Sequence, residues 1–169
     1  MTCSFPEYEI PNQQVRSHAT EIADAALILY EHMKKEHKCV PSVLLEGAFA
    51  IELYLKCLNS KTVAHPLADS SSVQLTAEPM THSHYLQQIF DGINQMIRDE
   101  LQQAYAEDPV IAGVAQLRDA LGRYNNLFVD IRYVFDKPAW IGHSINDFIN
   151  LLQFIRKQVD VMPRRYGTA

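Results

Sequence analysis

The chain has 169 residues, a hydrophobic fraction of 47% and a formal net charge of −5 at pH 7. A chain of this length can bury the core of one domain without disulfides or metal ions. The acidic balance argues against a broad nucleic-acid surface, because phosphate binding needs clustered Lys and Arg. The longest apolar runs are shorter than the stretch of about 18 residues that marks a membrane span, so we expect no membrane partner. Three widely spaced cysteines and the lack of a signal-peptide pattern favour a cytoplasmic location.

The first predicted helix runs from Gln13 to His37, after an N-terminal extension of residues 1–12. Its apolar residues recur at alternating steps of four and three, which places them on one face of a helix. These residues are Val15, Ala19, Ile22, Ala26, Leu29 and Met33.

A second predicted helix spans Ser42 to Asn59, with Pro41 suited to its first turn. Apolar residues cover nearly its whole circumference, and such a helix is normally central and buried. Glu52 and Lys56 interrupt the apolar pattern four residues apart, in the order that favours an ion pair.

Residues 61–80 lose helical periodicity and are predicted to form a long surface loop. The alternation of Val73, Leu75 and Ala77 is compatible with a short hairpin inside that loop. A third helix is predicted from His82 to Ala106.

A fourth helix is predicted to open at Asp108 and Pro109 and to end at Lys137 and Pro138. It would be the longest helix, since its apolar stripe persists for about seven turns. The stripe consists of Val110, Val114, Leu117, Leu121, Tyr124, Phe128, Ile131 and Phe135.

The last predicted helix begins after Ser144, which is placed as an N-cap with Asp147 three residues on. Residues 162–169 then form a C-terminal tail. The predicted fold is therefore all-α: a four- to five-helix up-down bundle in a single domain, residues 13–161.

Charged residues inside apolar stretches are the candidate functional residues. Glu52 and Arg132 both lie among core positions, and a buried charge is costly unless it is paired. We expect Glu52 to contact Arg132 or Lys56 as a structural ion pair. The alternative is an anion site at Arg132, where His84 caps a helix, packs or lines the site. The His and Cys residues lack the spacing of metal ligands, so we predict no metal and no cofactor.

Three segments carry a family resemblance: Glu46–Leu58, His84–Ile93 and Phe128–Asp136. In this order, over residues 13–161, the chain resembles HEPN domains. The resemblance implies a bundle of four or five helices that forms a homodimer and associates with RNA. Many members are metal-independent endoribonucleases of toxin–antitoxin or phage-defence systems. Others have lost catalysis and act as binding modules, and some work beside a nucleotidyltransferase partner.

The catalytic signature of that family is an Arg separated by four to six residues from a His. The Arg would hold the scissile phosphate and the His would transfer a proton. Arg132 matches the first half, but the window after it contains Lys137, Pro138 and Ala139. The His half of the motif is missing.

Three functional interpretations remain. The first is a catalytically degenerate HEPN-like module that binds RNA, a nucleotide or a protein. The second is an active metal-independent endoribonuclease in which His84 or His143 reaches Arg132 through space. The third is a structural or regulatory dimerisation protein. The candidate catalytic residues are Arg132 and His84, and the candidate ligand-binding residues are Glu52, Lys56, Asp130, Tyr133 and Asp136.

Overall fold

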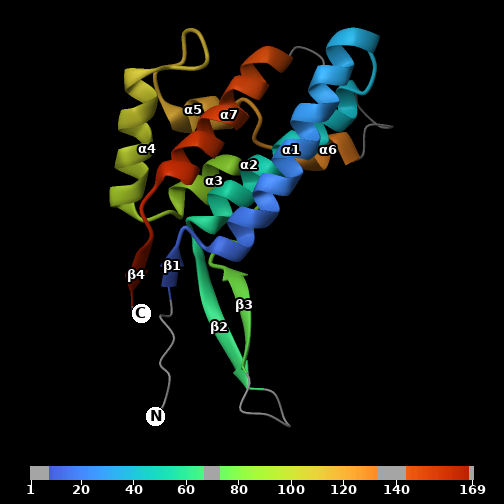
Figure 1. Ribbon diagram of the computed structural model, residues 1–169. Helices are drawn as coiled ribbons and strands as arrows, with labels where there is room; N and C mark the ends of the chain where they lie inside the picture. The colour runs from blue at the N-terminus through green and yellow to red at the C-terminus, as the bar shows by residue number, and fades with distance from the viewer. Residues whose placement is uncertain (1–7, 67–72, 133–143, 168–169) are drawn as a thin grey trace.

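The computed structural model describes residues 8–66, 73–132 and 144–167, and Figure 1 shows their arrangement. The chain is predominantly helical, as predicted, and its long helices form the body of the molecule. The longer helices are α1 (Gln13–Glu36), α2 (Val40–Cys57), α4 (Gln95–Glu107) and α7 (Ile145–Val161). The short ones are α3 (Leu86–Asp91), α5 (Leu117–Gly122) and α6 (Leu127–Arg132).

Helix α1 matches its predicted span and packs lengthwise on α2. The Asn12 side chain accepts a hydrogen bond from the Val15 amide at 3.2 Å, which caps the first turn. Ala19, Ala23 and Ala26 are fully buried on the face toward the core. Because these side chains are small, the two helix backbones can approach closely.

Helix α2 lies at the centre of the body, as its all-round apolar pattern predicts. It contacts α1, α3, α6 and α7, and Figure 1 shows it surrounded by these elements. Gly47 lies where α2 meets α7: a Cβ atom there would be 2.5 Å from Cε1 of Phe148. The glycine therefore fixes how closely these two helices pack.

The predicted third and fourth helices are wrong in their extent. The third is interrupted at Gly92–Asn94, so that α3 and α4 are separate helices. Asp108 ends α4 instead of opening a long helix, and Gly113 has a φ of 73° in the segment that follows. Ile111 and Val114 are buried there without forming a helix. Up to Arg132, α5 and α6 stand in place of the predicted long helix, whose predicted end at Lys137 and Pro138 lies outside the described residues. Helix α1 is the longest helix of the described chain.

The predicted loop at 61–80 is largely an antiparallel hairpin. Strand β2 (Ser60–Pro66) pairs with β3 (Val73–Pro79), and the hairpin projects from the helical body in Figure 1. A second small sheet pairs β1 (Tyr8–Ile10) with β4 (Arg165–Gly167), so these parts of the predicted extension and tail lie side by side. Among the described helices, none is long and apolar enough to cross a membrane.

We expect Gly47→Ala to destabilise the protein by about 1–2 kcal/mol. The cost of overpacking against Phe148 should exceed the gain of about 1 kcal/mol in helix propensity. Urea unfolding would measure the change. In a Phe148→Leu background, where the obstructing ring is gone, the same alanine should be neutral or stabilising. Equal destabilisation in both backgrounds would show that the ring contact is not the cause.

Candidate functional site

The carboxylate of Glu52 is the most deeply buried charge of the described core, at 2% exposure. Lys56, one turn later on α2, approaches it with Nζ 2.7 Å from Oε1. His84 approaches from the turn before α3, with Nδ1 3.0 Å from Oε1 and 3.2 Å from Oε2. The predicted contact between Glu52 and Lys56 is therefore present, and His84 is a further partner that the ion-pair prediction did not include.

Burial makes this contact energetically demanding. A carboxylate removed from water loses its hydration, and only close donors offset that loss. Lys56 keeps only 14% of its side chain exposed, so it too is largely withdrawn from solvent. The cluster therefore requires the donors to stay in place.

The His84 ring contacts Glu52 through Nδ1, and the rest of the side chain is half exposed to solvent. Its side chain is 52% exposed, although its partner carboxylate is buried. A carboxylate can only accept hydrogen bonds, so we assign the proton to Nδ1. In the neutral ring this leaves Nε2 as an acceptor. A carboxylate that orients a histidine in this way is typical of sites where the second ring nitrogen binds a ligand or moves a proton.

The chain around His84 is fixed by a local turn. The Ser83 hydroxyl accepts from the Tyr85 amide at 2.9 Å and donates to Oε1 of Gln88 at 2.7 Å. The Gln87 amide in turn donates to Oδ1 of Asn125 at 2.9 Å, which ties the start of α3 to the turn before α6. The imidazole is therefore positioned by hydrogen bonds on both sides of its backbone.

An ion pair joins α3 to α5 beside this turn. Nε and Nη2 of Arg118 each lie 2.8 Å from a carboxylate oxygen of Asp91. The hydrogen bond from this guanidinium lowers the pKa of the Asp91 carboxyl below its usual value. The pair is exposed, so it should add little to stability, although it links the two short helices.

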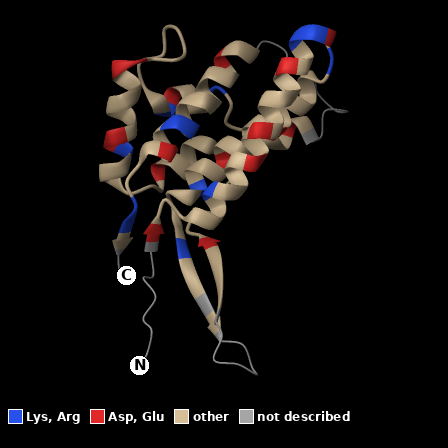
Figure 2. Cartoon of the chain, in the orientation of Figure 1, with Lys and Arg blue, Asp and Glu red and all other residues tan. Residues whose placement is uncertain are grey.

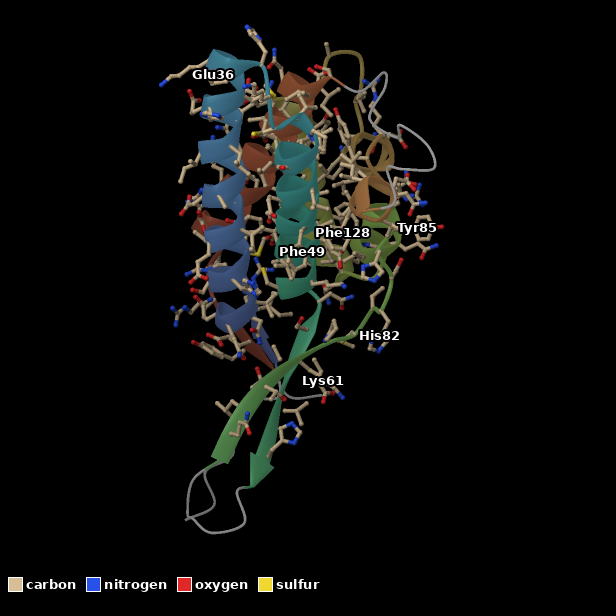
Figure 3. All side chains as sticks on the ribbon, turned by 90° about the vertical axis from the view of Figure 1, so that its right-hand side faces the viewer. Glu36, Phe49, Lys61, His82, Tyr85 and Phe128 are labelled. Carbon is tan, nitrogen blue, oxygen red and sulfur yellow. The ribbon has the colours of Figure 1, made fainter. Side chains whose placement is uncertain are left out.

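Aromatic rings continue the cluster across the surface. Phe49 on α2 and Phe128 on α6 stack with centroids 5.1 Å apart, and Figure 3 shows the two side chains next to each other. His84 lies 6.1 Å from Phe128, and His18 on α1 lies 6.1 Å from Phe49. Tyr85, which follows His84, is 42% exposed. Sequence reasoning placed both phenylalanines in apolar stripes and missed His18, whose position on the polar face of α1 gives no signal.

Of the other candidate residues, only Asp130 has a described side chain, and it is not among the described partners of Glu52. Asp130 is exposed and lines a cavity of about 220 Å³ at the junction of α5 and α6. Arg132 is the last described residue of α6, four residues after Phe128, but its side chain is outside the described part of the chain. Tyr133, Asp136 and His143 also lie outside the described residues. Contact of Arg132 with Glu52 or His84 remains a prediction.

The distribution of charged side chains and of possible metal ligands bears on which ligands the described surface can bind. Figure 2 shows Lys and Arg mixed with Asp and Glu over much of the helical body, with a basic cluster at the end of α1 that includes Lys34 and Lys35. In the described residues, no group of three or more His, Cys, Asp or Glu side chains is placed to hold a metal ion. The contacts of His84 with Glu52 and Phe128 can orient the imidazole, and the exposed part of its ring can bind a ligand by hydrogen bonds and ring contacts.

Comparisons of this chain with protein-family models, with curated proteins and with solved structures find no match.

We expect Lys56→Met to destabilise the protein by about 2 kcal/mol, because among the described residues it leaves His84 as the remaining side-chain partner of the buried Glu52 carboxylate. Replacing both residues, with Glu52→Leu and Lys56→Met together, should cost less than Lys56→Met alone. Urea denaturation of the two variants would measure this. Lys34→Met removes a solvent-exposed pair with Glu31 and should change stability little. A double variant less stable than Lys56→Met would contradict the desolvation argument.

Proposed function

We propose that the chain is a HEPN-like helical domain that binds single-stranded RNA or a nucleotide at the surface around His84, as a homodimer in the cytoplasm. One observation carries the proposal: an exposed imidazole is oriented by a buried carboxylate, beside exposed Tyr85 and partly buried Phe128. Burying the Glu52–Lys56 pair costs desolvation energy. A purely structural role for the Glu52 carboxylate would not require its other partner, His84, to be half exposed.

RNA fits this surface because unstacked bases bind to aromatic and histidine rings and to their hydrogen-bonding edges. Tyr85 and His84 are consecutive and both reach solvent. Figure 3 shows Tyr85 on the same side of the molecule as Phe128. The acidic net charge of −5 limits phosphate contacts. Binding should therefore depend on stacking and show a shallow salt dependence.

Fluorescence anisotropy with a labelled single-stranded RNA of mixed sequence tests this proposal. Loss of one stacked base costs about 1–3 kcal/mol, so Tyr85→Ala should weaken binding about tenfold. His84→Gln should weaken it as well. Tyr166→Ala on β4, also an exposed tyrosine, is the matched control and should bind like the unaltered protein. Undetectable binding to the unaltered chain, or equal loss in the control, would count against the proposed surface.

A second candidate function is metal-independent endoribonuclease activity, and the orientation of His84 favours it. With Nδ1 on Glu52, Nε2 is available to take the proton of a ribose 2′-hydroxyl as its oxygen attacks the adjacent phosphorus. The leaving 5′-oxygen takes a proton from water, the His84 imidazolium returns its proton to solvent, and the developing charge on the phosphate needs a cation. Arg132 is the candidate for the cation, because it matches the Arg of the family motif and lies on α6 four residues beyond Phe128.

Cleavage of the same RNA in excess chelator separates the two functions. If the chain is a ribonuclease, it should cleave this RNA, and His84→Gln and Arg132→Ala should each lose the activity. A substrate with 2′-deoxyribose at the scissile position should not be cleaved. His32→Gln, at an exposed histidine on α1, is the control and should retain activity. Binding without cleavage would support the degenerate module and reject the enzyme.

The homodimer, the toxin–antitoxin or defence setting and a nucleotidyltransferase partner belong to the same proposal, and the family resemblance alone supports them. Sedimentation analysis addresses the dimer directly. A chain that stays monomeric at about 100 μM would argue against it and against a purely dimerising role.

A further inference from the structure

An open groove of about 650 Å³ separates the first half of α1 from strand β3. Its described lining includes His18 but not Glu52, Lys56 or His84. The floor includes Val15 and Leu53, which are partly buried apolar residues. The helix wall consists of the exposed residues Gln14, Ser17, His18 and Glu21, and the strand wall consists of Thr76 and Ala77.

The groove follows the edge of β3. Thr76 and Ala77 are consecutive residues, so their side chains point to opposite faces of the hairpin. Both nevertheless line the same groove, which places it along the strand edge and not over one face. In the described part of the chain β3 pairs with β2 alone. The backbone groups on its outer edge are therefore available to another strand.

The hairpin lacks most of the features that protect a free edge. Natural edge strands usually carry charged residues or prolines that prevent pairing. From Gln74 to Ala77, β3 has neither, and its one charged residue is Glu78 near the base. Leu75 is 40% exposed on this strand. A two-stranded hairpin is also only marginally stable in water by itself, so a third strand would stabilise it.

We propose that this groove binds an extended peptide segment of a partner protein, which adds to β3 as a third strand. The helix wall from Gln14 to Glu21 is about 10 Å long at 1.5 Å per residue. That length accommodates about three residues of extended chain. Main-chain hydrogen bonds to β3 supply affinity, and side chains directed toward α1 supply selectivity.

The lining defines the chemistry of the peptide. Val15 and Leu53 receive an apolar side chain, while Glu21 is exposed and forms no ion pair with any described residue. A basic side chain two positions away from the apolar one would point to the same side and reach Glu21. The strand β3 of a second copy would instead bring the acidic Glu78. The groove is therefore matched to a basic partner segment.

The probe is a capped peptide of about five residues, mostly threonine, with a valine and a lysine two positions apart. Titration into the ¹⁵N-labelled full chain should give saturable amide shifts at Ser17, Thr76 and Ala77, with a dissociation constant of about 1 mM. A peptide with N-methylated backbone amides should not bind. Ser17→Arg, which fills the groove from an exposed position, should abolish the shifts.

Charge reversal gives the matched test. Glu21→Lys should weaken the lysine peptide and strengthen the same peptide with glutamate in place of lysine. Glu36→Lys, at the far end of α1, should change neither. Absent shifts at about 5 mM peptide, or binding that survives N-methylation, would overturn the proposal. Self-association that Ser17→Arg suppresses would assign the groove to a second copy and would also overturn it.

Discussion

The burial of one carboxylate within the central helix constrains much of this structure. Glu52 is withdrawn from water on α2, so its hydrogen-bond donors must remain close. Lys56 is supplied by the same helix, whereas His84 comes from a segment that begins after the hairpin. The carboxylate therefore fixes the entry to α3 against α2. The hairpin between them can project outward because both of its ends are held at the body.

Local sequence signals were sufficient to predict a helix where its apolar periodicity and its capping residue lie within the same segment. Helix α1 has a regular apolar face and an asparagine cap, and its predicted span is confirmed. Ser144 caps α7 as predicted, with its hydroxyl accepting from the Asp147 amide at 3.2 Å. The all-round apolar pattern of α2 correctly indicated a central helix. In each case the information lies within a few turns of the chain.

Periodicity failed where apolar residues are buried without forming a helix. Ile111 and Val114 belong to the predicted long stripe, yet they pack from an irregular segment that contains Gly113 in the left-handed region. Asn125 lies between α5 and α6, where the predicted helix is interrupted. Its side chain accepts a hydrogen bond from the Gln87 amide. The hairpin was only partly predicted, because the pairing of β3 depends on β2, a separate segment of the sequence.

The same distinction applies to the candidate site. The spacing of Glu52 and Lys56 predicted their contact, but nothing local predicted that His84 would be the second donor. Ring contacts extend this dependence on tertiary structure, because Phe49 packs on Phe128 at one side and meets His18 at the other. His18 also lines the groove beside β3. A ligand that displaced the His18 ring would thus remove an edge contact from Phe49. The surface around His84 and the groove beside β3 differ in chemistry, but both are linked through the ring of Phe49 on α2.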